Sequence, residues 1–327
     1  MKRRAWLTAT CSAIASATTA PSLLQSIAAP LPTPSPLPTP LSSSASQNEV
    51  GWIDAHVHVW PKLSTTYPLA SDYKPTDVVP NSFTPEELFQ LCRLAFVQRV
   101  VLIQMNFFGF DNRYMLDSIA RYPKFLSGVA IVDHEAKDLR DTMVRLRSEG
   151  IRGYRLYANA KNVAGWKNTP GIKELFRVCA ETNQAACLLS DPEALPEIES
   201  FVEQYPDTTV VIDHFSRIGM RGKVEAKDLD ALKRLARFKK TFVKTSAFYA
   251  LGEKKAPYKD LLPMIKSLRD SFGAERLMWA SDCPYQVQEP HKYEDSLALI
   301  RDFADFLSDT EKKRLLSGTA EHVFFQA

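Results

Sequence analysis

Short apolar runs alternate along this chain with longer, charged segments of helical periodicity. The intervening segments begin with start signals such as Thr84-Pro85-Glu86-Glu87 and predict helices at 84–96, 135–149 and 192–205. Strands alternating with helices predict a parallel sheet, and eight units in about 230 residues favour an α/β fold of the (β/α)8 TIM-barrel type. No G-x-G-x-x-G follows the first run, as a doubly wound dinucleotide-binding sheet would require. The predicted strands are 52–58, 99–107, 125–133, 151–157, 184–190, 209–215, 241–247 and 276–282.

The first 48 residues differ from the rest in charge. Lys2, Arg3 and Arg4 are the only charged residues there, and the remainder of the chain carries 38 basic and 38 acidic side chains. A body with balanced charge and no basic run argues against nucleic acid or an anionic membrane as the main partner. We therefore expect a small-molecule substrate, while nothing in the sequence sets the oligomeric state.

Residues 1–29 are expected to be an export signal. A basic start is followed by a mildly apolar stretch rich in Ala, Ser and Thr, and Arg3-Arg4-Ala5-Trp6-Leu7 resembles the twin-arginine motif. This predicts a periplasmic or extracellular protein, with an organellar transit peptide as the alternative. Prolines at every second position from 30 to 40 predict an extended linker over 30–48, which leaves 49–327 for the barrel.

Two further features of the body bear on its surroundings. No apolar stretch after the leader is long enough to span a membrane, so stable membrane insertion is not expected. Cys92, Cys179, Cys187 and Cys283 lie in or beside apolar runs without C-x-x-C spacing, and we expect buried free thiols.

Polar side chains gather at the carboxyl ends of the apolar runs. In a (β/α)8 barrel these ends and the loops after them form the active site, so this placement favours an enzyme. In chain order the polar strand-end residues are His56, His58, Gln104, Asn106, Asp133, His134, Arg155, Tyr157, Ser190, His214, Lys244, Ser246 and Asp282.

The first run is the most informative. Asp54, His56 and His58 stand at every second position, and alternate side chains of a strand share a face. The spacing therefore predicts these three side chains on one face, with two imidazoles converging on a metal or acid/base site.

Four motifs together resemble the amidohydrolase-related family of metal-dependent hydrolases, over nearly all of 49–327. They are His56-Val57-His58 after an Ile-Asp strand, Gly153-Tyr154-Arg155-Leu156, Val210-Val211-Ile212-Asp213-His214-Phe215 and Ala280-Ser281-Asp282-Cys283-Pro284. The resemblance implies a (β/α)8 barrel and an activity among sugar lactonases, pyrone-dicarboxylate lactonases and nonoxidative decarboxylases. It also implies that His56 and His58 are metal ligands, that Asp282 is a ligand or the acid/base, and that His214 is a ligand or a catalytic group.

The fourth and fifth strands depart from the family's metal-binding pattern. Relatives often supply a histidine or a modified lysine there, but these runs end in Arg155-Leu156-Tyr157 and Leu189-Ser190. The lactonase branch resembles this pattern better than the decarboxylase branch does. The remaining ligand candidates, His56, His58, His214 and Asp282, suit zinc or manganese. Since some lactonase-branch members are metal-independent, a metal-free site stays open.

Candidate substrate contacts complete the hypothesis. The planar guanidinium of Arg155 suits a substrate carboxylate or a developing oxyanion, with a salt bridge inside the barrel as the alternative. Tyr157, Trp60 and His291 are expected to line the mouth. Lys244 is expected in an ion pair, either at the surface or between sheet and helices, with a role in the site as the alternative.

The sequence thus predicts a hydrolase that opens a lactone or related cyclic ester of a small carboxylated or sugar-derived substrate with metal-activated water, Asp282 and His214 being catalytic. The alternatives are a nonoxidative decarboxylase of an aromatic or muconate-type acid, and an exported barrel that binds a ligand without turnover.

Overall fold

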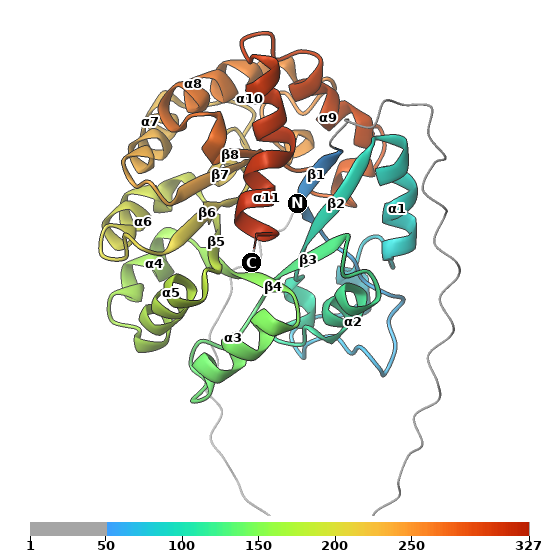
Figure 1. Ribbon diagram of the computed structural model, residues 1–327, viewed down its shortest axis with the longest axis vertical. Coiled ribbons are helices and arrows are strands. Elements are labelled where there is room, and N and C mark those ends of the chain that lie inside the picture. The colour runs from blue at the N-terminus through green and yellow to red at the C-terminus, as the bar shows by residue number, and fades with distance from the viewer. Residues whose placement is uncertain (1–50, 327) are drawn as a thin grey trace, which may run out of the picture. The chain divides into compact units, whose positions relative to one another are not determined.

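A computed structural model describes residues 51–326, so the predicted leader at 1–29 and linker at 30–48 lie outside the described residues. Eight parallel strands form one sheet in the order β1 to β8, each paired with the next (Figure 1). The strands are β1 (Trp52–Val57), β2 (Val97–Ile103), β3 (Leu126–Ala130), β4 (Ile151–Ala158), β5 (Ala185–Ser190), β6 (Thr209–Ile212), β7 (Thr241–Thr245) and β8 (Leu277–Trp279).

Backbone contacts between β1 and the segment after β8 close the ring. Val57 pairs in parallel with Cys283, the amide of Asp282 donates to the His56 carbonyl at 2.9 Å, and the amide of His58 donates to the Cys283 carbonyl at 2.8 Å. The predicted (β/α)8 barrel is confirmed. The first and last strands meet where the sequence places its histidines and Asp282.

Helices surround the strands, and the predicted start at Thr84 is confirmed by a capping box with Glu87 (Figure 1). None of the described helices is long and apolar enough to cross a membrane. The helices are α1 (Pro85–Leu94), α2 (Arg113–Arg121), α3 (Leu139–Ser148), α4 (Ala160–Trp166), α5 (Pro170–Thr182), α6 (Leu195–Val202), α7 (Ala226–Arg234), α8 (Leu262–Phe272), α9 (Tyr293–Arg301), α10 (Asp309–Lys313) and α11 (Thr319–Phe324).

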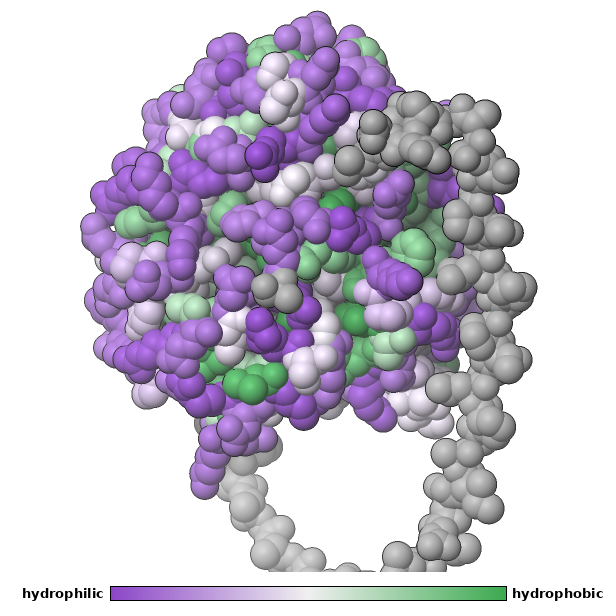
Figure 2. Space-filling model, in the orientation of Figure 1, coloured by the Kyte–Doolittle hydropathy of each residue, from purple (hydrophilic) through white to green (hydrophobic). Residues whose placement is uncertain are grey.

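An apolar layer fills the barrel interior and is covered by α11, which packs against β1, β4 and β8 (Figure 1). We call this set the lower layer. On the face of the molecule that carries α11, the exposed residues are mostly hydrophilic, so the lower layer is hidden from solvent (Figure 2). Its members are Ile53, Ala55, Val101, Ile103, Val129, Ala185, Cys187, Val211, Phe242, Met278, Ala280, Ala320, Val323 and Phe324.

A bulge in β1 changes which side chains point inward. Asp54 is opposite Val100 and Val57 is opposite Leu102, so three residue steps on β1 match two on β2. Asp54 therefore points outward and accepts a hydrogen bond from Tyr293 of α9 at 2.7 Å. The prediction that Asp54 shares a face with both histidines is wrong, because the extra residue breaks strict alternation.

Several predicted strands are longer than the observed ones at their carboxyl ends. The runs 99–107, 209–215 and 276–282 end as strands at Ile103, Ile212 and Trp279. Beyond these points the chain leaves the sheet and its polar side chains turn into the barrel mouth. The four cysteines of the described chain are free and buried, as predicted, and burial raises the pKa of Cys187 to about 12.

Candidate active site

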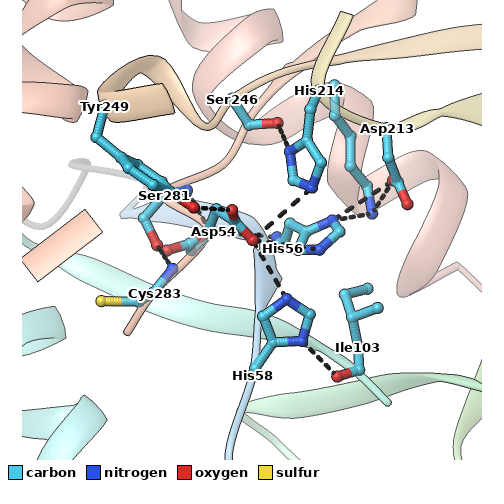
Figure 3. A network of polar contacts seen from close by, with 12 residues as sticks. Asp54, His56, His58, Ile103, Asp213, His214, Ser246, Tyr249, Ser281 and Cys283 are labelled. Atoms are coloured by element: carbon cyan, nitrogen blue, oxygen red, sulfur yellow. Dashed lines mark hydrogen bonds and ion pairs between the residues drawn. The ribbon is translucent and has the colours of Figure 1, made fainter. Parts of the chain in front are cut away.

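Asp282 lies within 3.7 Å of three imidazoles, those of His56, His58 and His214, which point toward one another in Figure 3. Its Oδ1 lies 3.2 Å from Nε2 of His58 and 3.5 Å from Nε2 of His56. Nε2 of His214 is 3.7 Å from the same oxygen. The other oxygen, Oδ2, accepts a hydrogen bond from the Tyr249 hydroxyl at 2.7 Å. One carboxylate oxygen thus faces three imidazoles while the other is held by a tyrosine.

His58 has a defined tautomer. Its Nδ1 is 2.8 Å from the carbonyl oxygen of Ile103, at the end of β2. Because a carbonyl only accepts, Nδ1 carries the proton, and Nε2 of the neutral ring presents a lone pair. That lone pair faces Asp282 Oδ1, so the contact is stable only with a proton or a cation between the two atoms.

His214 reaches the site from a strained turn after β6. His214, Phe215, Ser216 and Arg217 all have φ between +52° and +56°, a left-handed conformation that costs roughly 1–2 kcal/mol per residue. Asp282 also has a positive φ, +66°. The Nδ1 of His214 lies 2.8 Å from the Ser246 hydroxyl, which fixes the ring. Strain at these positions is typical of functional sites.

Burial and neighbouring charges set the protonation of the site. Burial alone would raise the pKa of Asp282, but the nearby imidazoles of His214, His58 and His56 hold it well below its usual value. Burial lowers the pKa of His214, against the opposing pull of Asp282. Burial and the nearby Asp282 raise the pKa of Tyr249 far above its usual value. Asp282 is therefore an anion, and Tyr249 keeps its proton to donate.

The donor atoms fit a divalent metal ion. His56, His58 and Asp282 offer ligand atoms that all lie within 4.8 Å of one another. In the described part of the chain, Nε2 of His56 is buried and has no hydrogen-bond partner. Nε2 of His214 faces the same carboxylate oxygen, so imidazole nitrogens and one carboxylate oxygen, the ligand types that zinc accepts, lie together.

A cavity of about 290 Å³ opens onto this cluster. Arg155 lines it, and among the described residues its buried Nε has no hydrogen-bond partner. Arg217 also lines it, but its guanidinium is held by Asp191 at 2.6 Å and by Tyr157 at 3.1 Å. The full lining is His58, Met105, Asn106, Arg155, Leu189, His214, Arg217, Met220, Ala247, Tyr249, Ala250, Leu251, Asp282 and Tyr285.

Three residues predicted to contact substrate lie elsewhere. Trp60 is fully buried, and its indole nitrogen donates to the Pro80 carbonyl at 2.9 Å. The Nδ1 of His291 is 2.9 Å from the Tyr258 hydroxyl. Tyr157 is exposed beside Arg217. None of Trp60, Tyr157 and His291 lines the cavity, because Trp60 and His291 are bonded to other neighbours and Tyr157, on β4, faces outward beside Arg217.

Sequence reasoning missed Tyr249 and the place of Lys244. Instead of lying between sheet and helices, Lys244 is fully buried inside the barrel, with its Nζ 3.2 Å from Nδ1 of His56. Strand alternation could have placed Lys244. Residues two apart on a strand share a face, and Phe242, two residues before Lys244 on β7, points into the barrel as part of the lower layer. Tyr249 stands in a 3₁₀ turn after β7, where no periodic pattern predicts direction.

Comparisons of this sequence and structure with known proteins identify a family and several similar proteins. The family model described as "Amidohydrolase" matches residues 53–326. An L-fucono-1,5-lactonase of Burkholderia ambifaria is 29% identical, covering 83% of this chain and 94% of that protein. A 4-sulfomuconolactone hydrolase of Rhizobium radiobacter is 26% identical, covering 78% and 83% respectively. The crystal structure of a Burkholderia multivorans amidohydrolase with bound zinc superposes with a TM-score of 0.73 at 19% identity, covering 85% of this chain and all of that chain.

Proposed function

We propose that this chain, which belongs to the amidohydrolase family, opens the ring of a lactone or related cyclic ester with water. The family resemblance predicted from the four strand-end motifs is confirmed. The observation that carries the proposal is the convergence of three imidazoles on one oxygen of Asp282 at the end of a cavity. The names of two relatives, an L-fucono-1,5-lactonase and a 4-sulfomuconolactone hydrolase, support the substrate class.

Asp282 is the residue that moves the proton. Its Oδ1 accepts a proton from water as the water oxygen bonds to the ester carbonyl carbon. The bond between that carbon and the ring oxygen then breaks, and Asp282 returns the proton to the departing oxygen. Tyr249, bonded to Oδ2, keeps Oδ1 turned toward the imidazoles and the cavity throughout.

The ion that we propose for the site is zinc, with manganese as the alternative. His56, His58 and His214, with Asp282 while its carboxylate carries no proton, would hold it, and nitrogen and oxygen ligands of this kind suit zinc. When bound, such an ion supplies Lewis-acid polarisation of the carbonyl and acidifies water. A site in which Asp282 and the histidines activate water without an ion is the competing arrangement.

Arg155 points to a substrate with a carboxylate. Its guanidinium lines the cavity and, within the described residues, enters no ion pair, whereas Arg217 is already held by Asp191. A cation with free donors in a confined cavity favours an anionic ligand, and the planar fork of arginine matches a carboxylate. The proposed substrate is therefore a small lactone that carries a carboxylate.

The test is a panel of lactones with and without a carboxylate, assayed by a pH indicator. Ring opening releases a proton, and we expect turnover with preference for the carboxylated members. Arg155→Gln should lower kcat/KM for those members by about 10- to 100-fold, the worth of hydrogen bonds to a charged group, and leave neutral lactones nearly unchanged. Carbon dioxide release from an aromatic or muconate-type acid, or binding without turnover of any lactone, would overturn the proposal.

A further inference from the structure

Two fully buried charged side chains, Lys244 and Asp213, meet on the side of His56 that faces away from Asp282. Lys244 Nζ is 3.1 Å from Asp213 Oδ1 and 3.2 Å from His56 Nδ1, and Asp213 Oδ1 is 3.4 Å from the same nitrogen (Figure 3). The proton transfer proposed above uses neither Lys244 nor Asp213. They come from β7 and from the residue after β6, and the Lys244 ammonium also lies 5.2 Å from the ring centre of Phe324.

The hydrogen bond between Lys244 and His56 assigns the histidine's proton. A lysine ammonium has three donors and no acceptor, so Nδ1 of His56 is the acceptor. The single proton of the neutral ring then lies on Nε2. Asp213 competes only weakly with Lys244 for Nδ1 of His56. Its contact with Nδ1 is longer than that of Lys244, and among the described residues neither of its carboxylate oxygens makes a well-directed hydrogen bond.

His56 and His58 therefore differ in tautomer although they stand two residues apart. His58 donates from Nδ1 to the Ile103 carbonyl and presents an Nε2 lone pair. His56 presents an Nε2 proton, 3.5 Å from Asp282 Oδ1 but not hydrogen-bonded to it within the described residues. A histidine that ligates through Nε2 must hold its proton on Nδ1 instead. His58 is ready to ligate as it stands, and His56 is not.

We propose that Lys244 and Asp213 are positioning residues that set the tautomer of His56 with opposite effects, and thereby set the affinity of the site for a divalent ion. Lys244 holds the proton on Nε2 and opposes ligation. Asp213 is the acceptor for a proton on Nδ1, and a carboxylate behind a metal-binding histidine strengthens the ligand. The ring keeps one proton in both arrangements, since loss from Nε2 is matched by gain at Nδ1.

Two variants at neighbouring positions in the barrel separate these effects. Lys244→Met keeps the length of the side chain and removes the donor, so His56 can donate from Nδ1 to Asp213; zinc affinity should rise at least about tenfold. Asp213→Asn removes the carboxylate, and zinc affinity should fall by about 10- to 100-fold, as for other residues behind a ligand. The measurement is competition between a zinc chelator and the purified, metal-free protein, with thermal melting to confirm folding.

Lys244→Gln is the matched control. Its NH2 group can donate to Nδ1 without the positive charge and, unlike methionine, competes with Asp213 for that nitrogen, so zinc affinity should stay below that of Lys244→Met. An increase in zinc affinity equal to that of Lys244→Met would show that charge, rather than the hydrogen bond, acts on the ion, and would overturn the proposal.

Nitrogen-15 NMR of the imidazoles tests the tautomer directly. In the metal-free wild type we expect the proton on Nε2 of His56 and on Nδ1 of His58, and in Lys244→Met on Nδ1 of both. A purely structural role for Lys244 would not move the His56 proton. A wild-type His56 protonated at Nδ1, or a folded Lys244→Met that binds zinc no tighter, would overturn the inference. The inference rests on the proposed site, but these readouts need no lactone, so its failure is distinguishable from failure of the proposed function.

Discussion

The barrel interior consists of two layers that differ in nearly every respect. The lower layer is apolar and closed by α11, whereas the layer above it holds three histidines, Asp282 and a buried ion pair. Strand β1 contributes to both, with Ala55 below and His56 above. The same strands thus carry apolar residues that stabilise the barrel at one end and polar residues that form the site at the other. The lower layer holds the strands in place, and this fixes the positions of the polar side chains above it.

The largest effect is expected from removing the charge at the centre of the upper layer. Asp282→Asn should lower kcat by about 10³-fold, because the group that takes the proton is lost. The fold should persist, since the substitution keeps the size of a side chain outside the apolar core. Initial rates and thermal melting on the same preparation measure both quantities. Wild-type turnover by the folded variant would contradict the proposed proton transfer.

A substitution in the lower layer should have the opposite effect, lowering stability and leaving catalysis nearly unchanged. Met278→Ala should reduce the free energy of unfolding by about 2–5 kcal/mol, because it leaves a cavity in the lower layer. Urea unfolding measures this loss, and kcat corrected for the folded fraction should change little. If kcat collapsed while stability stayed the same, the two layers would not be separate.

The smallest effect is expected at the edge of the upper layer. Tyr249→Phe removes the hydroxyl that holds Asp282 Oδ2, a hydrogen bond to a charged group worth about 1.5–3 kcal/mol. We expect kcat/KM to fall by about 10- to 100-fold, less than kcat falls in Asp282→Asn. Tyr258→Phe is the control, since that hydroxyl contacts Gln286 and His291 outside the cavity. An equal fall in kcat/KM in both variants would show that the Tyr249 hydroxyl has no specific role in the site.

Regular spacing in the sequence predicted the barrel and the convergence of polar side chains at its mouth. Strand and helix periods indicated the fold, and the strand-end rule brought His56, His58, His214 and Asp282 together. Asp54 was assigned to the wrong face because a bulge without glycine or proline leaves no mark in the residue pattern.

Residues beyond the strands were harder to place. His291 lies in an irregular segment and Tyr249 in a short 3₁₀ turn, and the direction of such side chains depends on backbone angles that no period encodes. Only the structure therefore reveals that the cavity is lined by Tyr249 and not by His291.

Because α11 lies near the C-terminal end of the chain, the part of the barrel that it covers is closed late in protein synthesis. Ile53 and Ala55 leave the ribosome early, but the side chains that cover them, Val323 and Phe324, are added some 270 residues later. Until then a growing chain lacks the α11 side chains that close the lower layer beneath β1. The interior is therefore completed only after translation has passed residue 324, and the strands and helices made in between must wait for it or be shielded by other proteins.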